Sequence, residues 1–433
     1  MAERELISTW HDGSRIGRFV EEQSAGIRFE YDPDYRGIPL SVSLPSPPTQ
    51  RAPDAAAAHF LDNLLPTPTW ARRILAASQL REEFDDFALL GHIGLECPGR
   101  MMLSWPRLAG SLRTHQEAFL DEEHFKHWVA NPADRPLMPM NNGRTAFTLS
   151  GSRPKAILKF SSERFWRPTI PVLGASSTHL LKAPTDDDST HEVIEEWICL
   201  QLAEKVIGKT LVTPGELWNQ CLKVQRYDRR MRAGQVYRIH QEDFAQALGI
   251  SAADSRADAG DADDVPSTLL ARAAALIDEL GRQGRIRVPA LQKDRFFRQL
   301  MLRLLLGDPG LGLKKFSLIH HDNGQIELAP MYGLRCKRGR VSPDSETANQ
   351  FPGNRLIVGL GRQSEDFSEQ DCIDCASLQL GLSRRYAARE LKQIRQNLLK
   401  LPGSLWSIQL AQRHPEAEPL IRRVLESLRE RLQ

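Results

Sequence analysis

The spacing of apolar residues changes along this chain, and that change most constrains its fold. Beyond the segment Ser251 to Val265, apolar side chains recur three or four residues apart, which is the spacing of one buried helix face. The four stripes are Leu269, Ala273, Leu276 and Leu280; Phe297, Leu300 and Leu304; Ala387, Leu391, Ile394 and Leu398; and Leu420, Val424 and Leu428. The C-terminal part is therefore predicted to be mainly helical, with these stripes facing its core.

The first hundred residues follow another pattern, in which short apolar runs alternate with turn residues. The runs are Leu6 to Trp10, Ile27 to Tyr31 and Ser41 to Leu44. Such alternation predicts a small sheet. Helical spacing follows over Ala55 to Leu65 and Trp70 to Leu80. We expect a compact α+β subdomain that ends near Pro106.

The middle of the chain mixes strand and helix signals. Residues 107 to 140 contain one predicted helix, Glu117 to Val129, followed by turn residues. Strand-like runs are Thr145 to Leu149, Ala156 to Phe160, His179 to Lys182, Leu222 to Arg226 and Val236 to Ile239. A helix is predicted over residues 192 to 206, because Ser189 and Glu192 have capping-box spacing. Ser251 to Val265 has almost nothing apolar to bury and is predicted to be a loop. Asp322-Asn323-Gly324 predicts the turn of a hairpin.

These patterns divide the chain into four parts. We predict an N-terminal α+β subdomain over 1–106, a connecting helix and linker over 107–140, a mixed lobe over 141–240 and a helical lobe over 241–433. The fold class is α+β. A small mixed lobe before a helical lobe is compatible with a protein kinase, although that architecture alone does not fix a function.

Composition excludes several function classes. Lys and Arg total 57 against 55 Asp and Glu, so the net charge of +2 gives no general attraction to nucleic acid or membranes. The longest apolar runs fall short of the roughly 18 residues that a membrane span needs, and we expect a cytoplasmic protein. Of six cysteines, only Cys372 and Cys375 form C-x-x-C, and no second ligand pair accompanies them. Reduced structural thiols are the better interpretation.

Several ordered strings resemble the HipA family of bacterial toxin kinases, from about residue 6 to at least 335. They are Pro39 to Pro45 and Asn63 to Pro66, similar to its N-terminal subdomain; Thr148 to Lys155, similar to its glycine-containing loop over the nucleotide; Thr178 to Lys182, similar to its lysine strand; Glu195 to Leu200, similar to the helix that supplies its glutamate; and Arg226 to Arg230 with Gln241 to Phe244, similar to its hinge. The resemblance implies a kinase-like two-lobed fold with a HipA-like N-terminal subdomain.

The resemblance also implies a set of nucleotide-binding residues: Ser150, Gly151, Ser152, Lys155, Lys182, Glu196, Gln225, Tyr227, Asp228 and Lys315. A strand lysine facing a helix glutamate forms the ion pair that positions an ammonium for the phosphates, and Lys182 with Glu196 is the candidate pair. Gly151 between two serines lets backbone amides approach phosphate. Thr148 occupies the position where family members often carry an autophosphorylated serine.

The segment Leu306 to Ser317 resembles the family's catalytic loop but lacks its chemistry. Aligned on Gly307 and Phe316-Ser317, Gly310 stands at the position of the catalytic aspartate and Lys315 at that of the metal-binding asparagine. Downstream, Ala329 to Leu334 is similar to the second metal-binding motif, and there Gly333 replaces the aspartate. Losing the base and both metal ligands removes the means to hold magnesium on the phosphates. The sequence therefore predicts a pseudokinase with no catalytic residues and no bound metal.

The resemblance implies binding partners in place of catalysis. Family members pair with a helix-turn-helix antitoxin, so we expect such a partner or a second HipA-like protein, with DNA reached only through the partner. No cofactor is required, although Lys315 could neutralise phosphate charge and leaves open the binding of ATP without magnesium.

Three alternatives remain open. Asp308 is a rescue candidate that would keep the chain an active kinase or another nucleotide-dependent transferase through a rearranged loop. Two basic clusters could bind nucleic acid: Arg226, Arg229, Arg230 and Arg232, and Arg335, Lys337, Arg338 and Arg340. Asp322 beside His320 and His321 could hold a metal, but turn geometry explains Asp322 equally well.

Overall fold

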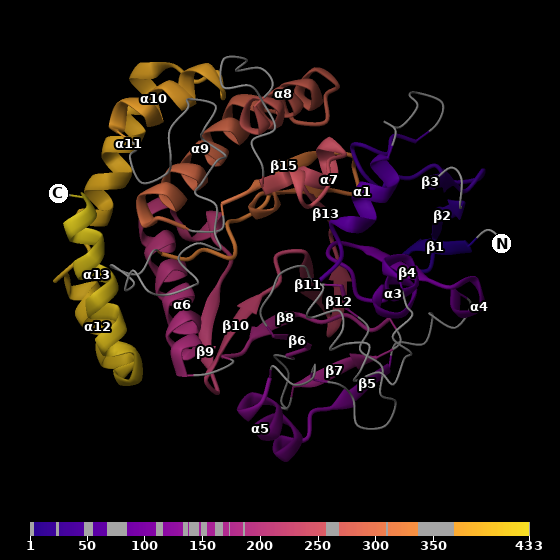
Figure 1. The fold of residues 1–433 in the computed structure, drawn as a ribbon, viewed down its shortest axis with the longest axis horizontal. Helices are drawn as coiled ribbons and strands as arrows, with labels where there is room; N and C mark the ends of the chain where they lie inside the picture. The colour runs from indigo at the N-terminus through magenta and orange to yellow at the C-terminus, as the bar shows by residue number, and fades with distance from the viewer. Residues whose placement is uncertain are drawn as a thin grey trace. The chain divides into compact units, whose positions relative to one another are not determined.

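The computed structural model describes residues 4–22, 26–46, 55–66, 85–109, 116–132, 137, 147–148, 154–160, 168–172, 174–184, 187–256, 268–308, 311–336 and 368–432. The chain forms two compact units (Figure 1). Unit 1 comprises Met1–Thr190, Trp218–Ala252 and Leu318–Gly324, and unit 2 comprises His191–Leu217, Ala253–Ser317 and Gln325–Gln433. The predicted boundaries at 106, 140 and 240 remain predictions.

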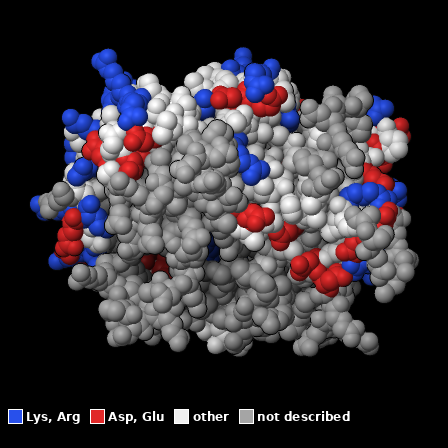
Figure 2. Space-filling view, turned by 45° about the horizontal axis from the view of Figure 1, so that its top comes forward, with Lys and Arg blue, Asp and Glu red and all other residues white. Residues whose placement is uncertain are grey.

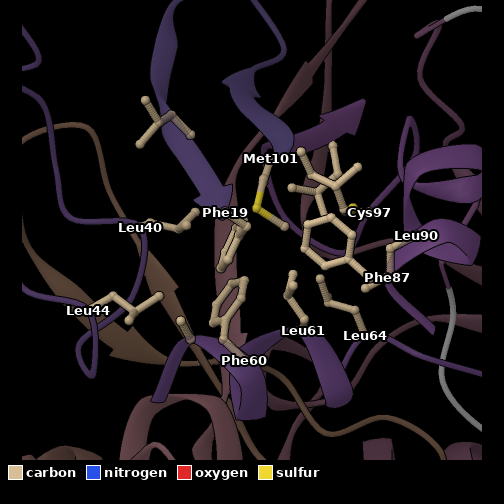
Figure 3. Close-up of a cluster of buried hydrophobic side chains, with 14 of the residues drawn as sticks. Phe19, Leu40, Leu44, Phe60, Leu61, Leu64, Phe87, Leu90, Cys97 and Met101 are labelled. Atoms are coloured by element: carbon tan, nitrogen blue, oxygen red, sulfur yellow. The ribbon is translucent and has the colours of Figure 1, made fainter. Parts of the chain in front are cut away.

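Unit 1 begins with a four-stranded antiparallel sheet. Its strands are β1 (Arg4–Trp10), β2 (Arg15–Glu22), β3 (Gly26–Tyr31) and β4 (Met101–Ser104), in the order β3-β2-β1-β4. The helices of this region are α1 (Ala56–Asp62), α3 (Asp86–Ile93) and the short α4 (Pro106–Ala109). Figure 3 shows the core between the sheet and helices α1 and α3, in which the rings of Phe19 and Phe60 stack with their centroids 6.0 Å apart. The small sheet with a packed helix is confirmed.

The rest of unit 1 contains a second sheet. Strands β6 (Lys155–Leu158), β8 (His179–Lys182) and β10 (Cys221–Gln225) pair antiparallel in that order. The other described elements are β5 (Gln116–Phe119), α5 (Glu122–Ala130), β7 (Thr169–Val172), β11 (Arg229–Arg232), β12 (Gln235–Arg238), β13 (His240–Asp243) and α7 (Phe244–Leu248); β9 (Gly215–Trp218) and β14 (Ser317–His320) lie at the unit boundary. The strands predicted from residue 179 onward are confirmed to within one residue or so.

Unit 2 is mainly helical. Its helices are α6 (Asp187–Ile207, from His191 onward), α8 (Leu269–Arg282), α9 (Pro289–Leu306), α10 (Glu369–Leu378), α11 (Arg384–Leu399), α12 (Leu405–Arg413) and α13 (Glu418–Leu432), with strand β15 (Ile326–Leu328) and short 3-10 turns at Lys209–Leu211, Asp254–Arg256, Leu313–Lys315 and Pro415–Ala417. The α11 and α13 stripes are buried throughout, as predicted. The α8 and α9 stripes are buried except for Leu276 and Leu304, which are half-buried. The hairpin turn is confirmed, because Gly324 has a φ of 79° that favours glycine.

Four local predictions are wrong. Ser41 to Leu44 forms a tight turn closed by one bridge between its ends, not a strand. The sequence also missed β2, whose polar face is held by Arg18, which pairs with Glu5 and Glu30 on the neighbouring strands.

The other two errors concern helix starts. The helix expected from residue 117 begins at Glu122, after strand β5, because the Asp121 carboxylate caps it by accepting from the His124 N–H. Helix α6 begins at Asp187, so Ser189 lies inside it and cannot form the predicted capping box. Trp70 to Leu80 and most of Ser251 to Val265 lie outside the described residues. No described helix is long and apolar enough to span a membrane.

Candidate functional site

The end of helix α9 builds the loop that carries the degenerate motif. Gly307 closes the helix with a φ of 67°, and its N–H donates to the carbonyls of Arg303 and Leu304. The Asp308 N–H then donates to the Arg303 carbonyl, 2.8 Å away. This left-handed cap turns the chain back on the helix. The Asp308 carboxylate consequently meets the Arg303 guanidinium, with Oδ2 2.5 Å from an Nη atom.

Arg303 is fully buried and joins the two predicted metal-binding segments. Its guanidinium donates to the carbonyls of Tyr332 at 2.6 Å, Gly333 at 3.3 Å and Lys315 at 3.3 Å. The sequence analysis missed this residue. The signal was present, because Arg303 follows Leu300 by three residues and so falls within the apolar stripe of α9.

Lys315 and Gly333, the two positions of the missing metal ligands, lie in contact. The Lys315 Nζ donates to the Gly333 carbonyl at 2.8 Å, and a Cβ built on Gly333 would lie 3.3 Å from that Nζ. Two ligands of one metal ion must lie this close, since each binds within about 2–2.6 Å of it. An ammonium group therefore stands where the resemblance places a cation and its ligands.

The electrostatic surroundings of Lys315 disfavour its charge. Desolvation lowers the pKa of this half-buried lysine to about 8, aided by the nearby positive charges of Arg303 and Arg335. The negative charges of Asp308 and Glu196 only partly oppose the shift. Glu196, the predicted helix glutamate, lies on α6 and is 2% exposed. Its negative charge acts to raise the pKa of Lys315.

The loop offers little to a divalent metal. Asp308 is fully buried, and Arg303 occupies its carboxylate. Across the described ranges, no group of three His, Cys, Asp or Glu side chains is arranged to hold a metal ion. Gly310 lies outside the described residues. The chemistry that this loop presents is cationic.

Unit 1 holds the two strand lysines of the predicted site. Lys155 on β6 lies directly opposite Lys182 on β8 in the antiparallel register. Lys155 is 7% exposed, whereas Lys182 is half-buried. Ser150, Gly151 and Ser152 lie outside the described residues.

The hinge residues have partners within unit 1. Asp228 is 2.8 Å from Arg226 and from Arg229, and it accepts the Gly99 N–H at 2.7 Å. The Tyr227 hydroxyl donates to Gln241 at 2.7 Å, and Gln225 is exposed at the end of β10. Assignment of these three residues to the nucleotide stays a prediction, and for Asp228 the carboxylate is already engaged.

Glu96 is the centre of this buried network. Its carboxylate pairs with Arg226 at 3.0 Å, Arg229 at 3.1 Å and Arg238, all at most 7% exposed. Burial alone would raise the pKa of Glu96, but the three guanidinium charges outweigh it and lower the pKa to about 2. The nucleic-acid hypothesis is wrong for Arg226 and Arg229, because they face inward.

The predicted metal site divides into a buried histidine and an exposed aspartate, and the predicted phosphosite is buried. Nε2 of His320 lies 2.8 Å from the fully buried Glu242 carboxylate, which accounts for the inward position of this histidine without a metal. Asp322 lies in the exposed hairpin turn and pairs with Arg100 at 2.8 Å. Thr148 is fully buried, and its N–H donates to the Glu96 carbonyl at 3.2 Å. A phosphate on Thr148 would require this segment to open.

Comparisons with known proteins agree with this architecture. A family model described as the HipA-like C-terminal domain matches residues 147–401, and one described as the HipA N-terminal domain matches residues 7–104. The chain is 29% identical over 343 residues to the putative kinase Y4mE of Sinorhizobium fredii, covering 76% of each chain. It is 23% identical over 398 residues to the putative kinase Y4dM of that organism, covering 86% of this chain and 85% of the relative.

A solved structure supports the same fold. HipA from Shewanella oneidensis, in a complex with HipB and its operator DNA, superposes with a TM-score of 0.72 at 22% identity, covering 99% of this chain and 96% of that one. The fold is therefore the kinase-like α+β fold predicted from the sequence. With one family model covering more than half of its length, the chain belongs to the HipA family.

Proposed function

We propose that this HipA family member is a pseudokinase that acts by binding partners and not by phosphoryl transfer. The observation that carries the proposal is the contact between Lys315 and Gly333. Both positions of the metal ligands have lost their carboxylate or amide, and a lysine ammonium fills the space between them. Phosphoryl transfer depends on positioning and on magnesium charge, so this replacement removes its main catalytic device.

The size of the effect follows from Coulomb's law. Two unit charges 4 Å apart repel by about 4 kcal/mol at an effective dielectric constant of about 20, and a divalent ion doubles this to about 8 kcal/mol. Asp308 does not offset the repulsion, because its charge is paired with Arg303. Magnesium binding beside a protonated Lys315 is therefore strongly disfavoured.

Nucleotide binding without magnesium fits the same residues. Lys315 is a half-buried cation that could neutralise phosphate oxygens. Calorimetric titration with ATP, with and without magnesium, tests this part of the proposal. We expect binding that magnesium leaves unchanged, and a magnesium-dependent increase in affinity would contradict it.

The proposed partner is a helix-turn-helix antitoxin or a second, active HipA-like protein in the cytoplasm. Support comes from the HipA-like N-terminal domain and from the Shewanella HipA structure, which was solved with HipB and operator DNA. In this proposal the partner reads the operator sequence. A regulatory role, such as sequestering an active homologue, then needs no catalysis.

Incubation of the purified chain with labelled ATP and magnesium tests the proposal directly. We expect no phosphate on the chain itself or on added protein substrates. Auto- or trans-phosphorylation above that of a heat-denatured control would overturn it.

A second candidate is an active kinase or nucleotide-dependent transferase that uses Asp308. The burial of this carboxylate against Arg303 counts against it, since a general base must reach its proton. One comparison of variants distinguishes this second candidate from the pseudokinase. Loss of an enzymatic or toxic phenotype in Asp308→Asn but not in Lys315→Asn would favour the second candidate, provided that both variants remain folded.

A further inference from the structure

Two of the six cysteines lie in contact within unit 2. Cys199 is buried on helix α6, and its thiol is hydrogen-bonded to that of Cys336. The two residues are 137 positions apart in the chain, so only the fold brings them together. A disulfide requires two Cβ atoms that point toward each other, and a side-chain hydrogen bond between the thiols meets that requirement.

Cys336 is the member of this pair that an oxidant can reach. It is half-buried, whereas the other five cysteines are buried. The hydrogen bond with Cys336, together with burial, raises the pKa of the Cys199 thiol well above its ordinary value of 9.0. The proton therefore stays on Cys199, which makes Cys199 a poor first target, since the thiolate is the reactive form.

The C-x-x-C pair of helix α10 lacks this accessibility. Cys372 and Cys375 are both buried, and the Cys375 Sγ donates to the Gln379 side chain at 3.9 Å. Burial raises the pKa of Cys372 to about 12 and also raises that of Cys375. Inert structural thiols remain the interpretation of this pair.

The pair Cys199 and Cys336 borders the cationic site. Cys199 follows Glu196 by three residues, so both lie on one face of α6. Cys336 follows Gly333 by three residues. A covalent bond between the two thiols would tie α6 to the segment whose Gly333 carbonyl accepts from Lys315.

We infer that Cys199 and Cys336 form a reversible disulfide on exposure to hydrogen peroxide, and that this bond fixes α6 to the segment after Gly333. The Cys336 thiolate attacks one peroxide oxygen, the O–O bond breaks, and a sulfenic acid forms with release of hydroxide. The Cys199 sulfur then displaces the sulfenic hydroxyl, which leaves as water with the Cys199 proton. In total, two thiols lose two electrons and two protons, and one peroxide becomes two waters.

Peroxide suits this position because it is small and uncharged. Figure 2 shows basic and acidic side chains interspersed over the described part of one face, and such charges neither attract nor exclude a neutral oxidant. In a reducing compartment, disulfides of this kind are transient and act as redox sensors. The regulation goes beyond the proposed binding role, and it does not depend on whether the chain transfers phosphate.

The test exposes the full chain to a few-fold excess of hydrogen peroxide, unfolds it, and counts the remaining thiols by alkylation with N-ethylmaleimide and mass spectrometry. The variant carries Cys336→Ala. The matched control carries Cys372→Ala, which removes one thiol from the buried pair of α10. Circular dichroism checks that both remain folded, and peptide mapping of the wild type locates any linked cysteines.

We expect the oxidised wild type to keep four of its six thiols, with Cys199 linked to Cys336, and dithiothreitol should restore all six. Cys336→Ala should keep all of its thiols, whereas Cys372→Ala should lose two. The bond closes a long loop of chain, so oxidation should raise the midpoint of thermal unfolding by about 5–10 °C in the wild type and the control. The midpoint of Cys336→Ala should not change.

Retention of all six thiols by the oxidised wild type would overturn the inference. A bond between Cys372 and Cys375 in place of the expected one, a bond between two chains, or oxidation of Cys336 to a sulfinic acid with Cys199 left free would overturn it equally. A linked chain with an unchanged unfolding midpoint would refute the restraint that the bond is inferred to impose.

Discussion

The cost of keeping Lys315 charged gives a quantitative test of the cationic site. The pKa of this lysine falls from an ordinary value of 10.5 to about 8, chiefly because burial removes water from the ammonium. At about 1.4 kcal/mol per pKa unit, the charged form costs the folded state about 3 kcal/mol at neutral pH. We predict that Lys315→Met stabilises the protein at pH 7, by about 2 kcal/mol after loss of a hydrogen bond worth about 1 kcal/mol.

The lowered pKa of Lys315 determines the direction in which the free energy of unfolding changes with pH. Between pH 8 and 10.5, the unfolded chain holds a proton on Lys315 that the folded chain has released. The free energy of unfolding of the wild type therefore rises with pH across this window, relative to that of the variant. The advantage of Lys315→Met should be complete below pH 8, vanish near pH 9.5 and turn into a deficit of about 1 kcal/mol above pH 10.5, where only the lost hydrogen bond remains.

Urea unfolding at pH 7 and pH 10, followed by tryptophan fluorescence, measures both effects. Lys209→Met, at an exposed lysine of the same unit, is the matched control and should change stability by less than about 0.5 kcal/mol at either pH. The reasoning fails if Lys315→Met destabilises the protein at pH 7, or if its effect does not change with pH.

Three further predictions concern buried charges. Glu96→Gln should destabilise the protein by about 3–5 kcal/mol in urea, because Arg226, Arg229 and Arg238 lose their shared counterion, whereas Glu22→Gln at a surface pair should cost less than about 1 kcal/mol. Asp308→Asn should cost about 3 kcal/mol by leaving the fully buried Arg303 without its ion-pair partner, and a neutral result would show that this pair is unimportant. Burial, with the neighbouring charge of His320, lowers the pKa of His240 to about 3, so the unfolded chain binds an extra proton between pH 6.5 and 3. Stability should fall as pH drops through that window, and an acid titration of His240→Phe should show a shallower fall; an equally steep fall in the variant would contradict this reasoning.

Local patterns predicted much of this fold. The turn at Asp322-Asn323-Gly324 and the stripe of α11 depend on neighbours a few residues apart, and both appear as expected. The likeness of the loop after Gly307 to a known catalytic loop also predicted that two residues distant in the chain lie close together. Lys315 and Gly333 are 18 residues apart in the chain. Their alignment with the family's motifs predicted that they share one site, and in the structure the two residues are in contact.

Tertiary partners could not be predicted in the same way. Glu96 lies about 130 residues before Arg226 and Arg229, and no local spacing links them. In the sequence, Arg303 only interrupts an apolar stripe. Its role depends on contacts with Asp308 and the Tyr332 carbonyl, which only the folded structure shows. Strand β2 was missed for a related reason, because the charges on its polar face are paired across the sheet with Glu5 and Glu30.

Phosphoryl transfer by a restored chain tests the central claim most directly. The variant carries Gly310→Asp, Lys315→Asn and Gly333→Asp, and aspartate or asparagine tolerates the φ of 58° found at residue 333 better than most residues do. With labelled ATP and saturating magnesium, we predict that the wild type transfers no phosphate and that the restored chain does. Phosphorylation by the wild-type chain, equal in rate to that of the restored chain, would contradict the claim that these three positions silence the protein.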